Sequence, residues 1–315
     1  MTDSVQGICE QPDLVLVNPA AGGGRARVSV PHLCEFAKER GWNAEICLTH
    51  NPDDLMERAK SAAQAGRRRI FVVGGDGTFQ LLLNALANYR DVILGVLPAG
   101  GGNDLASALG LPPDPVQAAA LLLHGEVCQL DAVRVRTADG NERLYSGGGG
   151  VGVDAEAARY ANGALRNMRG RLRYVLAALR ALLGFHAMRV RVLTNGDSAT
   201  SVEDTVLLAA VLNTPSYGAG LCLAPEAKTD DGKLDVVILK KLRLMEILEL
   251  LPGFVTRSQL KSSKLHRTSA ASVRIETDVP HWFHGDGELL GMTPVEISVV
   301  PLAFCVIRAA RTSKI

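Results

Sequence analysis

The residues best suited to chemistry form a short turn, Gly74-Gly75-Asp76-Gly77-Thr78, between the apolar run 70–73 and an apolar helical pattern. Glycines let the backbone come close to a ligand, and the N-terminus of the following helix offers amide groups and a positive dipole end to an anion. Thr78 is expected to cap that helix. Asp76 needs a divalent cation or a hydrogen-bonded network between itself and a phosphate. An ordinary strand-to-helix turn is the alternative interpretation.

Two acidic clusters lie in the C-terminal half of the chain. Asp286-Gly287-Glu288 follows an aromatic, strand-like run, and its two acids make a compact acid/base candidate; a simple hairpin turn is the competing interpretation. The run 228–235 holds three carboxylates within six residues. These could bind a hard cation through oxygen ligands, or they could belong to a solvated Asp-Gly turn.

The elements that must position the first turn alternate between strands and helices. Short apolar runs at 14–17, 44–49, 70–73 and 92–97 read as buried parallel strands. Helices are expected at 26–40 and 53–65, the former with its inward face formed by Val28, Leu33, Phe36 and Ala37. This alternation predicts a parallel sheet with right-handed crossovers, whose loops gather at one edge.

Three of these strands end in glycine-rich turns. The first is followed by Asn18 and the glycines 22–24, the third by the 74–78 turn, and the fourth by Gly100–Asp104, while Thr49 ends the remaining strand. No Gly-Lys-Ser/Thr follows any of these glycines, so a Walker A loop is excluded. A nucleotide bound at this edge would be held mostly by main chain.

From about residue 127 the pattern becomes mainly β, which predicts a second domain. The glycine run 147–152 satisfies GxGxxG, but it lies within a strand pattern and is not expected to open a helix. Helical stretches are predicted at 165–183 and 243–257. The first carries five arginines on an amphipathic pattern, which is typical of a helix on anionic lipid or of a packed helix with a solvated face.

Composition limits the number of domains and the classes of function that remain. The chain has 315 residues, 47% of them apolar, with a net charge of +1 and six scattered cysteines. Two domains are expected at this length, and neither a nucleic-acid surface nor a zinc or disulfide framework is indicated. The sequence shows no signal-peptide pattern and no apolar run of membrane-spanning length. We therefore expect a cytoplasmic protein, with contact to a membrane surface left open.

Five motifs together resemble the diacylglycerol kinase catalytic family, and more closely the bacterial soluble lipid kinases of the diacylglycerol/sphingosine kinase superfamily. They are Asn18-Pro19-x-x-Gly22, Gly74–Thr78, Leu97-Pro98-x-Gly100-x-Gly102-Asn103-Asp104, Gly150-x-Gly152-x-Asp154 and Asp286-Gly287-Glu288, in order along the chain. The resemblance runs from about residue 14 to residue 308.

The resemblance implies an α/β nucleotide-binding domain of Rossmann-like type with a parallel sheet (1–126 plus about 300–315). A mainly β sandwich domain (127–299) follows, with ATP between the two. It implies an ATP- and Mg²⁺-dependent kinase of phospholipid biosynthesis, acting on the hydroxyl of diacylglycerol or a related lipid; a homodimer is left open. Asp286 and Glu288 match the acid/base motif, and Lys228, Asp231 and Lys233 match a structural magnesium loop. The implied ATP contacts are Asn18, Thr49, Gly74, Gly75, Asp76, Gly77, Thr78, Gly101 and Asn103.

The chain departs from the family pattern at three places. Gly101 stands where threonine is usual, Gln80-Leu81 where Asn-Glu is usual, and Gly147 where asparagine is usual. These departures keep a non-catalytic ATP-binding membrane module conceivable. A dinucleotide kinase resembling NAD kinase is a further alternative, because it shares the Gly-Gly-Asp-Gly turn, but the motifs at 97–104 and 286–288 disfavour it.

Overall fold

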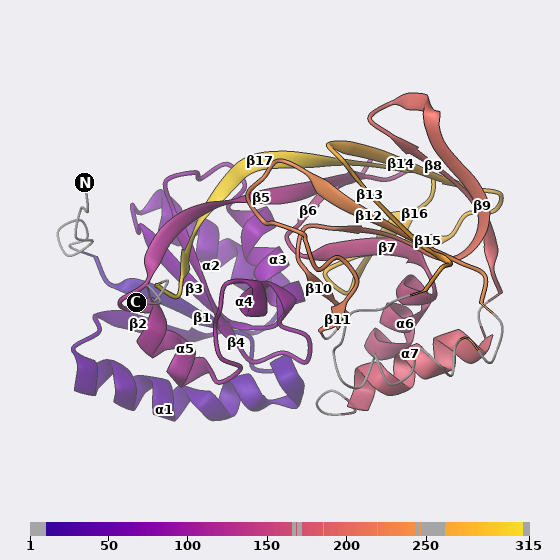
Figure 1. Ribbon diagram of the computed structural model, residues 1–315. Helices are drawn as coiled ribbons and strands as arrows, with labels where there is room; N and C mark the ends of the chain where they lie inside the picture. Colours follow the sequence, from indigo (N-terminus) through magenta and orange to yellow (C-terminus); the bar gives the residue numbers. More distant parts are fainter. Residues whose placement is uncertain are drawn as a thin grey trace, which may run out of the picture. The chain divides into compact units, whose positions relative to one another are not determined.

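The structure is a computed structural model, and it describes residues 11–165, 168, 172–184, 186–218, 220–242, 246 and 262–310. The chain divides into two compact units (Figure 1). Unit 1 comprises Met1–Gly100, Leu109–Gln129 and Phe304–Ile315, and unit 2 comprises Gly101–Ala108 and Leu130–Ala303. Two long strands, β5 (Glu126–Arg136) and β17 (Val295–Arg308), each contribute residues to both units.

Unit 1 is built on a parallel sheet in the order β4-β3-β1-β2, with the last part of β17 parallel to β4. The strands are β1 (Asp13–Val17), β2 (Ala44–Leu48), β3 (Arg69–Gly74) and β4 (Ile93–Pro98). Residues of β1, β3 and β4 are buried almost throughout, as expected of parallel strands covered on both faces. The prediction of a parallel α/β unit is confirmed.

Helices cover both faces of this sheet (Figure 1): α1 pairs with α5, and α2 pairs with α3. Their bounds are α1 (Arg25–Arg40), α2 (Pro52–Gln64), α3 (Asp76–Ala85) and α5 (Pro115–Leu122), and the short helix η2 (Ala21–Gly23) precedes α1. Two of them begin at side-chain caps followed by proline: Asn51 accepts from the amide of Asp54, and Asp114 accepts from two amides of α5. Gly41 ends α1 in the left-handed conformation.

The predicted inward face of α1 is right for Leu33, Phe36 and Ala37, which are buried, and wrong for Val28, which is 71% exposed. Five residues separate Val28 from Leu33, which places the two side chains about 140° apart around the helix. The buried stripe begins instead at Ala26.

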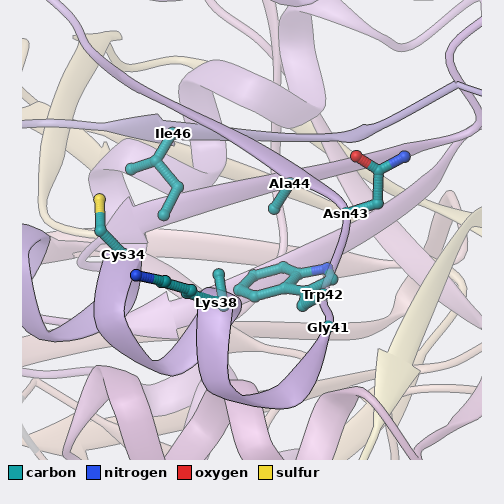
Figure 2. Close-up of a pocket in the computed structure, with 8 residues that line it drawn as sticks. Cys34, Lys38, Gly41, Trp42, Asn43, Ala44 and Ile46 are labelled. Carbon is teal, nitrogen blue, oxygen red and sulfur yellow. The ribbon is translucent and has the colours of Figure 1, made fainter.

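The end of α1 is joined to the edge strand β2 through Trp42. Its indole nitrogen donates to the Asp13 carboxylate at 2.6 Å, and its ring lies edge-on to Phe36 and Phe71. Burial raises the pKa of Asp13, opposed by Trp42 and Arg69. Figure 2 shows Trp42 in a surface pocket of about 420 Å³ between α1 and β2. This pocket lies where β2 begins, away from the strand ends that carry the glycine turns.

Unit 2 is mainly β. Its antiparallel path runs β16-β15-β7-β9-β8-β14-β17, with β12 also paired to β9, β13 to β12, and β6 to β5. The bounds are β6 (Glu142–Tyr145), β7 (Gly148–Gly152), β8 (Met188–Thr194), β9 (Asp197–Leu212), β10 (Ser216–Tyr217), β11 (Leu221–Cys222), β12 (Leu234–Lys240), β13 (Leu265–Ala270), β14 (Ser272–Thr277), β15 (Trp282–Gly285) and β16 (Glu288–Met292).

Both faces of this sheet are apolar, because side chains alternate along the strands. In β9, Ala209 and Val211 join one core cluster, while Leu208, Ala210 and Leu212 join another. Among the described residues, the helices of this unit with printed bounds are α4 (Asp104–Ala108), α6 (Val153–Asn162) and α7 (Leu172–Gly184), and α6 packs on α7 (Figure 1).

Two helical predictions need correction. The glycine run does open a helix, since α6 follows β7 directly with Gly152 as its N-cap at φ 117°; only glycine adopts that conformation readily. In the stretch predicted at 165–183, the described helix begins at Leu172, and the arginines at 166, 169 and 171 lie outside the described residues. Arg173 donates to Asn162 of α6 at 2.8 Å, and Arg180 lies over the Tyr160 ring.

The helix predicted at 243–257 lies outside the described residues except for Glu246. None of the helices in the described part of the chain has both the length and the apolar character needed to cross a membrane.

Candidate active site

The carboxyl ends of β1, β2, β3 and β4 are joined by hydrogen bonds of the main chain and of the Thr49 hydroxyl. The amide of Asn18 donates to Val73 at 3.1 Å, and that of Ala99 donates to Gly74 at 2.8 Å. The amide and the hydroxyl of Thr49 both donate to the carbonyl of Val17. The expected gathering of strand-end loops at one edge of the sheet is therefore present in unit 1.

Asn18 joins two of these loops through its side chain. Its amide nitrogen donates to the Thr78 hydroxyl at 3.0 Å, and its oxygen accepts from the amide of Ala20 at 3.1 Å. Thr78 is therefore not the helix cap: Gly75 takes that place without a side-chain bond, and α3 begins at Asp76. A Cβ on Gly74 would lie 2.4 Å from the Cβ of Thr78, so this glycine is needed for the approach of Thr78.

The two loops present backbone where a phosphate would bind. In α3 the first intrahelical bond joins the amide of Phe79 to Gly75, so the amides of Gly77 and Thr78 come before it. In the other loop Gly22, Gly23 and Gly24 all have positive φ, and a Cβ on Gly22 would lie 1.9 Å from the carbonyl oxygen of Ala99. Both loops fit an anion held by main chain at a helix N-terminus.

The predicted ATP contacts Gly101 and Asn103 lie in Gly101–Ala108, which the sequence assigns to the first domain and the structure to unit 2. The reason is that α4 contacts β10. Asn103 has a φ of 60° and its carbonyl accepts from the amide of Ser107, so it begins the short helix. Its contact with ATP stays a prediction.

Asp286 forms the turn between β15 and β16, with a φ of 51°. Its amide donates to the carbonyl of Gly148 at 2.8 Å. Its carboxylate accepts from three consecutive amides, those of Ser146 (2.9 Å), Gly147 (2.9 Å) and Gly148 (3.2 Å), and from the Ser146 hydroxyl (3.1 Å). Hydrogen bonds of this kind stabilise the charged form, so the carboxylate is a structural anchor joining β15 to β7.

Glu288 begins β16 on the other side of the same turn, and the residue is exposed. Asn162 of α6 donates to the carbonyl of the intervening Gly287 at 2.8 Å, which fixes the turn. Desolvation by the surrounding protein raises the pKa of Glu288, and Arg173 and His284 oppose this rise. Because the residue keeps an exposed surface, solvent screens part of this effect.

The loop 228–233 is held from inside unit 2 by Asp131, which is fully buried. The amide of Asp131 donates to the carbonyl of Thr229 at 2.7 Å. Its carboxylate accepts from the amides of Gly232 (2.7 Å) and Leu302 (2.8 Å). The loop conformation is therefore fixed by a buried side chain outside the loop.

The expected cation ligands of this loop, Lys228, Asp231 and Lys233, are exposed. Asp231 accepts from the amide of Lys233 at 3.1 Å. Within the described ranges no three His, Cys, Asp or Glu side chains cluster as a metal site, so a cation here would depend on main-chain oxygens. Burial, then Asp231 and Glu226, raise the pKa of Asp235 to about 6. The neighbouring carboxylates of Asp231 and Glu226 are the smaller causes of this rise, and oxygen ligands of this kind suit a hard cation.

Sequence reasoning missed one buried polar cluster, formed by Asp154, Tyr217 and His284. The glycine run 147–152 is the signal that could have found it. A Cβ on Gly148 would lie 2.6 Å from the Tyr217 ring, and one on Gly150 would lie 2.4 Å from the Asp154 carboxylate. These glycines clear space on β7 for polar side chains.

Comparisons with known proteins agree with this architecture. Residues 12–135 match the diacylglycerol kinase catalytic domain, and residues 147–308 match the YegS C-terminal NAD kinase beta sandwich-like domain. A diacylglycerol kinase of Mycobacterium tuberculosis is 30% identical, covering 93% of this chain and 94% of its own. One from Bacillus subtilis is 27% identical, covering 90% and 91%.

Solved structures show the same fold. The crystal structure of a diacylglycerol kinase from Bacillus anthracis superposes with a TM-score of 0.70 at 22% identity, covering 95% of this chain and 97% of that one. A second crystal structure from the same organism reaches a TM-score of 0.77 at 24% identity, with 95% of both chains covered. The chain belongs to the diacylglycerol kinase family of lipid kinases, which are phosphotransferases. The resemblance seen in the motifs and the expected β-sandwich domain are thereby confirmed.

Proposed function

We propose that this protein transfers the γ-phosphate of ATP to the hydroxyl of diacylglycerol or a related lipid. The observation that carries the proposal is the pair of strand-end loops in unit 1, cross-linked by Asn18 and Thr78. Their glycines admit no Cβ at Gly22 or Gly74. Such a cradle suits phosphates held by main-chain amides, and the family membership supplies the reaction class.

In this proposal the loops of unit 1 bind and orient the ATP phosphates. Asn18, Thr49 and the Gly74–Thr78 turn form the cradle, and Asp76 lies in the first turn of α3, where it would face a phosphate-bound Mg²⁺. When bound, Mg²⁺-ATP supplies the phosphoryl group and charge neutralisation. The protein then contributes mainly by positioning the reactants and by stabilising the charge of the transition state.

Of the two acids at 286–288, we assign the proton transfer to Glu288. The carboxylate of Asp286 already accepts from three amides and a hydroxyl, so its lone pairs are committed to holding the turn. Glu288 is exposed and its pKa is raised, which suits a general base. As the new bond forms between the lipid oxygen and phosphorus, the bond to the β-phosphate oxygen breaks and the proton passes to Glu288.

The loop 228–233 would hold a structural Mg²⁺ through the carboxylate of Asp231 and the main-chain oxygens of Lys228 and Lys233. The fixation of the loop by the buried Asp131 and the carboxylates of Asp231 and Glu226 near Asp235 support this. We also expect a cytoplasmic protein that meets its lipid at a membrane surface.

The test of the function is the variant Glu288→Gln, with ATP binding measured separately by calorimetry. Loss of a general base lowers turnover by about 10²–10⁴-fold, while ATP affinity stays within about twofold because the cradle lies in unit 1. Turnover within tenfold of the wild-type value would remove Glu288 from this role. Retained turnover in Glu288→Gln together with inactivity of a folded Asp286→Asn would reverse the assignment of the two acids.

A further inference from the structure

The strand β2 forms an open edge of the parallel sheet of unit 1 (Figure 1). In the described part of the chain it pairs on one side, with β1. Its residues, Ala44–Leu48, contain no proline, no lysine and no break in register. Native proteins usually protect an open edge with such devices, so the bare edge of β2 favours pairing with another strand.

The bonds between β2 and β1 show which backbone groups face outward. The amide of Thr49 donates to the carbonyl of Val17 at 2.9 Å, so the backbone groups of Thr49 face β1. Along a strand these groups point to alternate sides. Those of Ala44, Ile46 and Leu48 therefore point away from β1, and among the described residues they have no hydrogen-bond partner.

The β2 strand of a second copy of this chain satisfies these groups in one antiparallel register. When the two-fold axis passes through Ile46, this residue lies opposite Ile46 of the second copy, and Ala44 lies opposite Leu48 of the second copy. Each of these pairs then exchanges two hydrogen bonds. Any other register that pairs outward-facing residues leaves one end of the strand without a partner. The edge is therefore complementary to itself, as an isologous two-fold interface requires.

The side chains on the α1 side of β2 fit the same register. Ala44 and Ile46 line the surface pocket of about 420 Å³ that also contains Trp42 (Figure 2). Leu48 lies on the same face of the strand, because side chains alternate, and it is 43% exposed. A two-fold axis perpendicular to the sheet keeps the α1 sides of both copies on one face. Leu48 of each copy then lies beside the small Ala44 of the other, at the pocket.

The charges on the α2 side of β2 do not oppose this pairing. Glu45 and Cys47 face that side, where they line a second hollow of about 470 Å³. Glu45 is already paired with Arg67 of its own chain. In the register centred on Ile46, Glu45 lies opposite Cys47 of the second copy, so two like charges are not placed directly opposite each other. Backbone groups, side-chain size and charge thus all fit a second copy of this chain.

We propose that β2 is the interface of a two-fold homodimer, in which antiparallel pairing across Ile46 joins the sheets of two copies of unit 1 into one continuous sheet. The inference does not depend on the proposed function, because it uses only the edge of the sheet and the side chains beside it.

The first test measures the mass of the full-length protein by sedimentation equilibrium over a range of concentrations. We expect a dimer for the wild type. Leu48→Lys should raise the dimer Kd by about 100-fold, or about tenfold for each of the two symmetric contacts, because the new charge faces Lys38 at the pocket. Leu121→Lys is the matched control, since Leu121 is 44% exposed on α5, and it should keep the wild-type Kd. A wild type that is monomeric at every concentration, or an unchanged Kd in Leu48→Lys, overturns the proposal.

The second test examines the register. Glu45→Cys places a thiol opposite Cys47 of the second copy, with Cα atoms about 4.5 Å apart in a pair without hydrogen bonds, which is within disulfide range. Mild oxidation should give a covalent dimer, and the double variant Glu45→Cys, Cys47→Ser should not. No covalent dimer from folded Glu45→Cys overturns the register. A monomer whose Ile46 amide is protected from hydrogen exchange would assign the edge to residues 1–10 of the same chain, and this too overturns the proposal.

Discussion

Asp286→Asn should lower the stability of the protein, and not only its activity. In the wild type the carboxylate accepts from the amides of Gly147 and Gly148 with one oxygen, and from the amide and hydroxyl of Ser146 with the other. Asparagine can keep its oxygen toward Gly147 and Gly148. Its NH₂ group then faces the Ser146 amide, and two donors oppose each other.

The cost can be worked from these contacts. Two hydrogen bonds keep an acceptor that is no longer charged, which lowers stability by about 1 kcal/mol each. One buried amide, that of Ser146, is left without an acceptor, which costs about 1–3 kcal/mol more. Asp286 is only half-buried, so partial solvation reduces the sum to about 3 kcal/mol. For a unit of this size, about 3 kcal/mol lowers Tm by roughly 6–12 °C.

Thermal unfolding followed by calorimetry measures this loss, with Glu288→Gln as the control on the same hairpin. Glu288 is exposed at the start of β16, so its variant should melt within about 2 °C of wild type, as expected of a surface substitution. If Asp286→Asn melts with the wild type while losing activity, the anchoring role is wrong and Asp286 acts directly in the chemistry.

Three further predictions follow from the two units. Gly74→Ala places a Cβ 2.4 Å from that of Thr78 and should weaken ATP binding by about tenfold, or 1.4 kcal/mol, in calorimetric titration. The control Gly184→Ala, where a Cβ meets nothing within 4 Å, should leave the affinity for ATP unchanged. The pKa of Glu288 is raised above its ordinary value of 4.5, and a general base acts only when it is deprotonated. The value of kcat/KM should therefore fall with decreasing pH through a midpoint above 4.5. A kcat/KM that stays constant down to pH 4.5 contradicts the assignment of Glu288 as the base. Mg²⁺ at 100 times its Kd should raise the free energy of unfolding of the wild type by about 2.7 kcal/mol, and chelation should reverse this rise. Asp231→Asn should show no such stabilisation by Mg²⁺, whereas the loop control Asp230→Asn should keep it. Equal stabilisation of the two variants would contradict the cation site.

The parallel sheet of unit 1 could be predicted because short runs of the sequence are enough to identify its strands. Apolar runs such as 70–73 mark buried strands, and parallel topology then brings their end loops together. Roles that depend on details of packing could not be predicted from the sequence. Val28 looked apolar and inward, but helix geometry turns it to solvent. Thr78 looked like a helix cap, but its hydroxyl accepts a hydrogen bond from Asn18, sixty residues earlier in the chain.

The site in unit 2 was hidden for a stronger reason. Asp286 could be found as part of an acidic pair, but its partners lie about 140 residues away, and no local pattern indicates them. Glycine lowers strand propensity, so Gly148 and Gly150 disfavour a strand when only the local sequence is considered. They are explained only by Tyr217 and Asp154 lying against them, so the buried cluster could not be predicted without the three-dimensional arrangement.

The most direct test of the account is transfer of labelled γ-phosphate from Mg²⁺-ATP to a total lipid extract, with a dinucleotide offered in parallel. We predict label in the organic-phase lipid, reduced by about 10²–10⁴-fold in Glu288→Gln, and none in the dinucleotide. Unlabelled lipid from a folded protein that binds ATP, or label in the dinucleotide instead, would contradict the central claim.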